Sequence, residues 1–117
     1  MKCDHTNHYE FDQAYFEGKC NSRSKTYDTP VMKEQASRHF AAIERVVEIE
    51  PGTRVLDIGC AYGDFLSICD SRNLETYGYD ISEHAISRAK TRTRAKLTVA
   101  HRRHARHPQG ADSLLGL

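Results

Sequence analysis

The feature that most constrains the fold is an alternation of strand-like and helix-like segments in the central part of the chain. A short apolar run at 54–58 and another at 76–79 predict two strands, the first of them buried. Helical patterns follow each strand, over 64–71 and from 83 to about 94, and Leu97–Ala100 can begin a third strand. Alternation of this kind predicts an α/β fold in which right-handed crossovers join parallel strands.

A longer helix is expected before this alternation. Thr29-Pro30 marks its start, because proline suits the first turn of a helix. It should end near Ile49, and residues 1–29 should form an irregular lead-in with one short helix around Asp12–Glu17. Apolar residues at helical spacing predict a buried stripe that packs this longer helix on the sheet: Ala36, Phe40, Ile43 and Val47.

The chemistry of the chain is concentrated in the turn from Asp57 to Gly63, which connects the first strand to the next helix. Glycines let the backbone of such a turn approach a ligand closely, and the helix directs unpaired N–H groups at the same space. Asp80 ends the second strand, 21 residues after Gly59, where a carboxylate can accept both hydroxyls of a ribose. Since ligands of parallel sheets bind beyond the carboxyl ends of the strands, the pattern predicts a nucleoside-containing cofactor.

The acid inside the turn narrows the choice of cofactor. The dinucleotide fingerprint is G-x-G-x-x-G, whereas this turn is D-x-G-x-A-x-G. A carboxylate at Asp57 would repel a pyrophosphate, but it would favour a ligand that carries ammonium and sulfonium groups. S-adenosylmethionine is such a ligand. The alternative is an ordinary strand-to-helix connection, and the positions of Asp57 and Asp80 together argue against it.

Several segments resemble the class I S-adenosylmethionine-dependent methyltransferases. Residues 55–66 look like the first motif of that family, residues 77–82 look like the second, and 85–89 match the helix that follows. Residues 15–18 are similar to segments that precede the domain in small-molecule members, so the resemblance covers about residues 9–94. It implies a Rossmann-like parallel sheet with flanking helices, and S-adenosyl-L-methionine as the cofactor.

The resemblance also implies roles for individual residues. Asp57 would orient the methionine end, Asp80 would hold the ribose hydroxyls and Ile81 would flank the adenine. Tyr15 and Tyr27 either close over the cofactor or serve in packing. The turn around the methionine portion and the sugar would be shaped by Gly59, Cys60, Ala61 and Gly63, with Ala61 in place of a frequent glycine.

The resemblance stops before the segments that bind the methyl acceptor in the family. The third strand runs into His101-Arg102-Arg103 and later strands are absent, so no catalytic residue is assigned. We expect a truncated domain, with the lead-in over 1–29, a partial cofactor-binding domain over 30–100 and a basic, disordered tail over 101–117. The tail also resembles out-of-frame translation of a GC-rich gene.

Composition restricts the partners only weakly. The chain of 117 residues carries a net charge of +1 and suits one small domain. No stretch approaches the ~20 apolar residues of a membrane span and no signal peptide is recognisable, so we expect a cytoplasmic protein. Seven Lys or Arg lie between Lys90 and Arg106 without an acidic residue. Because aromatic residues for base stacking are missing there, nucleic-acid binding is disfavoured.

The cysteines are expected to be free thiols, as is usual in a reducing compartment. No neighbouring histidine is placed to activate Cys60, so it should be a small buried thiol. A zinc site is conceivable from ligand type alone, but the spacing fits no recurrent pattern and no metal is expected at Cys3, His5, His8 and Cys20.

Three functions follow from the sequence. The first is methyl transfer from S-adenosylmethionine to a small-molecule acceptor. The second is a non-catalytic or inactive fragment that binds the same cofactor, and the third is a small basic nucleic-acid-binding protein. The sequence leaves open the acceptor, its reacting atom and the oligomeric state.

Overall fold

The computed structural model describes residues 11–19 and 26–100. Its elements alternate along the chain as the sequence predicts, and the short helix of the lead-in and the third strand are both confirmed. In chain order they are α1 (Gln13–Phe16), α2 (Pro30–Glu44), β1 (Arg54–Ile58), α3 (Asp64–Ser71), β2 (Glu75–Asp80), α4 (Glu83–Ala89) and β3 (Lys96–Val99).

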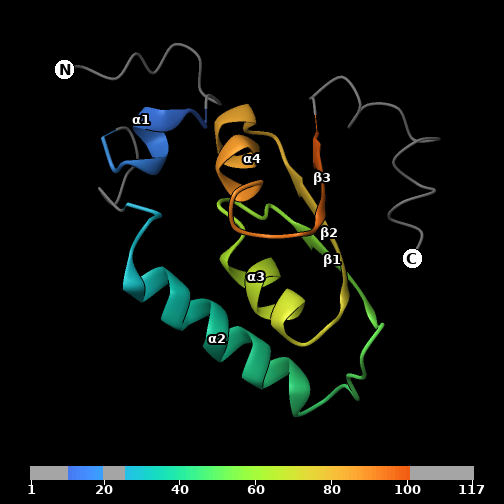
Figure 1. Ribbon diagram of the computed structural model, residues 1–117. Coiled ribbons are helices and arrows are strands. Elements are labelled where there is room, and N and C mark those ends of the chain that lie inside the picture. The colour runs from blue at the N-terminus through green and yellow to red at the C-terminus, as the bar shows by residue number, and fades with distance from the viewer. Residues whose placement is uncertain (1–10, 20–25, 101–117) are drawn as a thin grey trace.

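The strands form a parallel sheet in the order β1-β2-β3. In the register, Ile58 of β1 lies opposite Tyr79 of β2, and Asp80 of β2 lies opposite Val99 of β3. The carboxyl ends of the strands therefore meet at one edge of the sheet (Figure 1). In parallel sheets with helical crossovers, this is the edge at which ligands bind.

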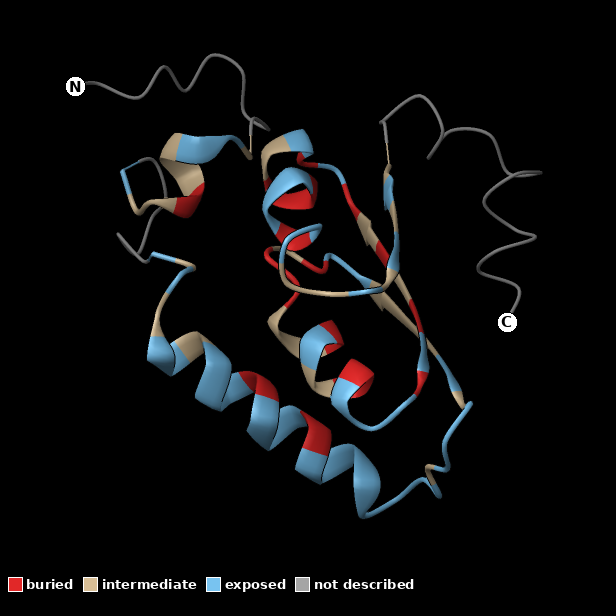
Figure 2. Cartoon of the chain, in the orientation of Figure 1, coloured by how far each residue is buried: buried red, intermediate tan, exposed pale blue. Residues whose placement is uncertain are grey.

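The described helices lie on one side of the sheet (Figure 1). α3 packs on β1 and β2, and α4 packs on β2 and β3. α2 forms an outer layer against α3, while α1 rests on α4. Figure 2 shows that the buried positions of α3 and α4 gather on the sides that face the sheet.

The centre of the core lies where α3 crosses β2. Leu66 and Cys69 of α3 are fully buried. A Cβ at Gly78 would come within 2.7 Å of Leu66 Cδ1 and 2.6 Å of Leu97 Cδ2. The missing side chain at this position is what lets α3 approach the central strand so closely.

The helices begin at residues that the sequence marks. Thr29 Oγ1 accepts a hydrogen bond from the N–H of Met32 at 3.2 Å, and Pro30 follows in the first turn of α2. Ser82 Oγ accepts the N–H of Ala85 at 3.0 Å and caps α4. α3 has no side-chain cap, because Gly63 precedes it in a left-handed conformation.

Two helices are shorter than predicted. α2 ends at Glu44 instead of near Ile49, and just beyond it the N–H of Val46 donates to the carbonyl oxygen of Ile43, three residues back, in a tightened turn. α4 ends at Ala89 instead of near Arg94. There the Asp70 carboxylate accepts the N–H of Arg94 at 2.8 Å and directs the chain into β3. Hydrophobic periodicity in the sequence predicts neither of these hydrogen bonds.

The predicted apolar stripe of α2 is only partly buried. Ala36 and Phe40 are buried, but the side chains of Ile43 and Val47 are 38% and 50% exposed. The reason is that α2 packs on α3 instead of on the sheet. Ile43 lies on the side of α2 that borders an open pocket, and Val47 comes after the end of the helix. β1, predicted to be buried, is also half-exposed, because the described helices cover only one face of the sheet.

Some expectations concern parts of the chain outside the described residues. These are the cysteine and histidine cluster at 3–20, most of the lead-in, and the tail over 101–117. Across residues 11–19 and 26–100, none of the helices has the length and apolar character needed to cross a membrane.

Candidate functional site

The turn between β1 and α3 is fastened to the end of β2 by hydrogen bonds. The N–H groups of Gly59 and Cys60 both donate to the carbonyl oxygen of Tyr79, at 2.7 and 3.0 Å. One carboxylate oxygen of Asp80 accepts the N–H of Ala61 at 2.9 Å, and the other accepts the N–H of Ser82 at 2.9 Å. Asp80 thus bridges the turns that follow β1 and β2, and it joins the two motifs found in the sequence.

Three positions of this turn have a left-handed backbone. The φ angles are +78° at Gly59, +49° at Ala61 and +83° at Gly63. Glycine adopts this conformation freely, whereas an alanine there costs about 1 kcal/mol. A Cβ at Gly63 would meet side chains of the segment after Ser82, but a Cβ at Gly59 would meet nothing within 4 Å. The backbone at Gly59 is therefore the part of the turn that a ligand can approach.

Asp57 is the second acid of the site, and its surroundings differ from those of Asp80. Within the described residues, no hydrogen bond or ion pair reaches its half-buried carboxylate. Burial, and then the negative charge of Asp80, raise the pKa of Asp57. A bound cation would relieve both effects and favour the ionised carboxylate. The geometry thus leaves Asp57 prepared for a positively charged ligand.

Two pockets open on either side of the turn and share Tyr27, Gly59 and Ala61. The strand-end pocket, of about 360 Å³, also includes Phe11, Tyr15, Tyr79, Asp80, Ile81 and Ala100. The α2 pocket, of about 470 Å³, lies between the turn and α2 and also includes Met32, Gln35, His39, Asp57, Asp64 and Phe65. Both volumes fall within the roughly 300–1,000 Å³ range of small-molecule sites.

The residues expected to bind the cofactor divide between these pockets. Asp57 and Cys60 line the α2 pocket, whereas Asp80 and Ile81 line the strand-end pocket. Gly59 and Ala61, as shared residues, line both. Gly63 lies in neither lining and packs instead against Ala89, the last residue of α4, and Thr93.

Cys60 contributes no reactive thiol. Burial, and then the charges of Asp80 and Asp57, raise the pKa of Cys60 to about 12. The thiolate is the nucleophilic form, and at such a pKa it is absent at neutral pH. Cys60 therefore serves the site through its backbone N–H and through packing beneath Gly78.

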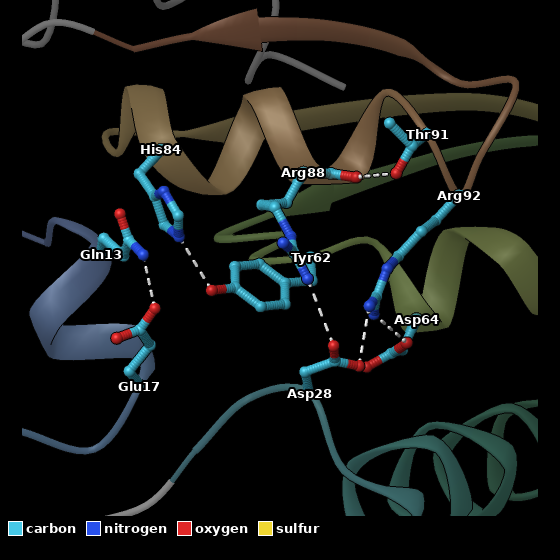
Figure 3. A network of polar contacts seen from close by, with 9 residues as sticks. All are labelled: Gln13, Glu17, Asp28, Tyr62, Asp64, His84, Arg88, Thr91 and Arg92. Atoms are coloured by element: carbon cyan, nitrogen blue, oxygen red, sulfur yellow. Dashed lines mark hydrogen bonds and ion pairs between the residues drawn. The ribbon is translucent and has the colours of Figure 1, made fainter.

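An aromatic cluster from the N-terminal segment closes one side of the strand-end pocket. The rings of Phe16 and Tyr62 are stacked, with centroids 5.1 Å apart. The Tyr62 hydroxyl is hydrogen-bonded to the His84 imidazole at 2.8 Å (Figure 3). The hydroxyl of Ser82 donates to the carbonyl oxygen of Phe11. The N-terminal segment is thereby attached to α4 and to the loop that holds Asp80.

Ion pairs hold the segment that leads into α2. Asp28 lies 2.7 Å from Arg92 and 3.2 Å from Arg88, and Arg92 lies 3.6 Å from Asp64 (Figure 3). Both guanidinium groups lie over the Tyr62 ring, at 5.2 and 5.4 Å from its centroid. The hydrogen bond from Arg92 is the main cause that lowers the pKa of Asp28. Burial raises the pKa of Asp64, although Arg92 opposes this effect.

The sequence analysis did not predict that side chains of α2 form one side of the α2 pocket. Met32, Gln35 and His39 follow each other at helical spacing and all line the α2 pocket. This second stripe runs beside the buried Ala36 and Phe40, so the spacing could have been seen. A helical period cannot tell which of two adjacent stripes faces a cavity, because that depends on where α3 and the turn lie.

Comparison with known proteins identifies the family to which the chain belongs. The sequence matches the model of a methyltransferase domain over residues 32–114. No curated protein matches the chain.

Solved structures of methyltransferases share the fold. An S-adenosylmethionine-dependent methyltransferase from Geobacter sulfurreducens, in complex with S-adenosyl-L-homocysteine, is 26% identical with a TM-score of 0.51, covering 79% of this chain and 36% of that chain. A corresponding enzyme from Thiobacillus denitrificans is 21% identical with a TM-score of 0.54, covering 79% and 38%. Magnesium protoporphyrin IX methyltransferase from Synechocystis is 15% identical with a TM-score of 0.51, covering 60% and 37%. The matched region thus spans little more than a third of these proteins, and the predicted α/β, Rossmann-like fold class is confirmed.

Proposed function

This chain belongs to the methyltransferase domain family, and on that premise we propose that it binds S-adenosyl-L-methionine and directs its methyl group to a small-molecule acceptor. The relative from Geobacter sulfurreducens holds S-adenosyl-L-homocysteine, which is what remains of the cofactor after transfer. Methyl transfer needs alignment of the nucleophile with the methyl carbon more than covalent help from the protein. A small acceptor is supported by the size of the α2 pocket, about 470 Å³.

The nucleoside half of the cofactor fits the strand-end pocket. Each oxygen of Asp80 accepts one backbone N–H and retains a lone pair that can accept a ribose hydroxyl. Because Asp80 is buried and fixed from two turns, it can hold a ribose in one orientation. Ile81 follows directly, is 45% exposed, and offers an apolar surface to the adenine.

The methionine half fits the α2 pocket, and the observation that carries the proposal is the carboxylate of Asp57, which has no partner among the described residues. S-adenosylmethionine brings an ammonium and a sulfonium group, and either of them would stabilise a half-buried carboxylate of this kind. The open backbone at Gly59 lets the ligand cross from one pocket to the other. Asp57 and Asp80 then hold opposite ends of one cofactor.

A second candidate is binding of the cofactor without methyl transfer. The observation that favours it is that the two acids of the site, Asp57 and Asp80, line the two pockets in positions that fit parts of the cofactor itself. Nucleic-acid binding is less well supported. Two arginines of the described part of the basic run are already engaged within the protein: Arg92 with the carboxylate of Asp28, and Arg94 with the backbone carbonyl oxygen of Asp70.

Calorimetric titration of S-adenosyl-L-homocysteine into the 117-residue chain tests the proposal, with circular dichroism of the same sample to establish folding. We expect saturable binding that Asp80→Ala abolishes and that Asp57→Asn weakens about tenfold or more, because a charge-assisted contact is lost. The exposed Glu48→Gln is the matched control and should bind as the parent does. A folded chain that does not bind would contradict the proposal.

A second assay separates transfer from binding alone. The chain is incubated with S-adenosyl-L-methionine and a pool of small phenols and amines, and S-adenosyl-L-homocysteine is measured over time. Release that depends on the pool supports transfer. Binding without such release favours the non-catalytic candidate.

A further inference from the structure

The α2 pocket is lined by polar side chains that the proposed cofactor site does not use. One side of it is the turn with Asp57, and the opposite side is α2, which contributes Gln35 and His39 among the apolar residues Met32 and Ile43. The function proposed above uses only the first side, where Asp57 is assigned to the methionine end of the cofactor. The α2 side is therefore the wall available to a second molecule.

Three groups that line this pocket could accept a proton: Asp57, Asp64 and His39. Asp57 is assigned to the cation of the cofactor, and Asp64 has Arg92 at 3.6 Å. His39 makes no hydrogen bond or ion pair with any residue of the described ranges, and its side chain is exposed on the pocket side of α2. Of the three groups, the imidazole is thus the base that remains uncommitted.

Building on the function proposed above, we propose that His39 is the proton acceptor for a neutral methyl acceptor that carries a hydroxyl or an amine. The acceptor oxygen or nitrogen forms a bond to the methyl carbon while the carbon–sulfur bond breaks, and that electron pair stays on the sulfur of S-adenosylhomocysteine. The proton of the acceptor moves to the imidazole nitrogen of His39. The imidazolium returns it to water through its exposed side.

The surrounding charges fit this step. Asp57 and Asp64 line the same pocket, and negative charge in the pocket favours an imidazolium over a neutral imidazole. The same two carboxylates repel a carboxylate or phosphate on the acceptor. The wall of Met32, Ala36 and Ile43 favours an apolar body. The acceptor class is therefore an uncharged, largely apolar hydroxyl or amine compound.

The test compares two ligands that differ at the reacting position. S-adenosylhomocysteine has a neutral sulfur there, and its analogue sinefungin has an amine that projects where the transferred methyl group would lie. If His39 faces that position, its imidazole accepts a hydrogen bond from the amine. Sinefungin should then bind the parent chain more tightly, and His39→Leu should reduce the ratio of the two dissociation constants about tenfold.

His84→Leu is the matched control, because its imidazole is bound to Tyr62 and lines neither pocket. A variant that disturbs contacts with the parts common to both ligands changes both dissociation constants equally, and this effect cancels in their ratio. A ratio that falls in His39→Leu and not in His84→Leu supports the proposal. An unchanged ratio in His39→Leu overturns it while leaving the cofactor site intact. Failure of both ligands to bind the folded parent chain overturns the proposed function, and the role of His39 with it.

Discussion

The two sides of the α2 pocket are built in different ways. The cofactor turn, residues 57–63, is held by backbone hydrogen bonds to Tyr79 and by the buried carboxylate of Asp80. The α2 side is held by packing on α3 and by partly exposed ion pairs at Asp28. Backbone contacts tolerate almost any side chain, whereas the α2 wall is made of side chains alone. The difference agrees with the proposed function, in which the turn binds the cofactor and the α2 side contacts the acceptor.

The difference also predicts which substitutions lower the stability of the fold. Changes under the turn should lower the free energy of unfolding, because they disturb the core. Changes in the α2 wall and its attachments should alter binding with little effect on folding. Partly exposed ion pairs contribute only about 0–1 kcal/mol each.

The largest loss of stability is expected for Gly78→Val. Its side chain would collide with Leu66 and Leu97, because a Cβ at this position would lie 2.7 and 2.6 Å from their methyl carbons, and overpacking of this kind costs about 3 kcal/mol. Urea unfolding measured by circular dichroism should show a much lower midpoint. Thr98→Val on the exposed part of β3 is the control and should change little. An unchanged midpoint for Gly78→Val would mean that α3 does not pack closely on β2.

Asp70→Ala should cost about 2 kcal/mol. Its carboxylate accepts hydrogen bonds from Thr76 at 2.7 Å, from Thr93 at 2.5 Å and from the N–H of Arg94 at 2.8 Å, and these donors would lose their partner. The neighbouring Ser71→Ala is exposed and should have a small effect. Equal midpoints for the two variants would argue against this link between α3 and β3.

The same residue predicts a pH dependence. Burial tends to raise the pKa of Asp70, but the hydrogen bonds from Thr93, Thr76 and Arg94 outweigh it and lower the pKa. A carboxyl with a lowered pKa stabilises the fold above its unfolded value of about 4, and this is lost as the pH falls through the folded pKa. The stability difference between the parent and Asp70→Ala should therefore shrink in acid. A difference that is constant with pH would contradict this.

Asp57→Asn should stabilise the fold but weaken binding of the cofactor. Because the folded pKa of Asp57 is raised, the ionised carboxylate destabilises the fold at neutral pH, and removing it should raise the urea midpoint by less than Asp70→Ala lowers it. Binding of S-adenosylhomocysteine by the parent should weaken as the pH falls and Asp57 takes up a proton, at a higher pH than for an ordinary carboxyl group. The variant should lack this part of the pH dependence. Glu48→Gln should leave both properties unchanged, and a less stable Asp57→Asn would show that Asp57 has a structural partner.

The smallest effect is expected for Asp28→Asn, below about 1 kcal/mol, because Asp28 and Arg88 are both 47% exposed. Its contribution should fall further in high salt, since screening weakens exposed pairs. Glu34→Gln removes the exposed pair with Arg38 and serves as the control for an ordinary surface contact. A large loss of stability in Asp28→Asn would place the attachment of α2 in the core of the fold.

Sequence patterns predicted the right elements where the signal is local. The caps at Thr29 and Ser82 form as expected, and Ala85, Ile86 and Ala89 of α4 are buried on one face. The patterns failed where a contact between residues far apart in the sequence determines the end of a helix or the exposure of a side chain. The segment after α4 is held by the hydrogen bond from Arg94 to Asp70, and Ile43 stays partly exposed because it borders the α2 pocket.

The sequence by itself determined the order of the elements, the parallel sheet and the residues of the cofactor turn, because periodicity, capping and glycine placement are local properties. Only the tertiary structure decided that Asp80 is engaged by two backbone donors while Asp57 has no partner among the described residues. It also decided that His39 lines the pocket between α2 and that turn. Those facts depend on which segments meet across the sheet edge, and a one-dimensional pattern does not contain the positions of its neighbours in space.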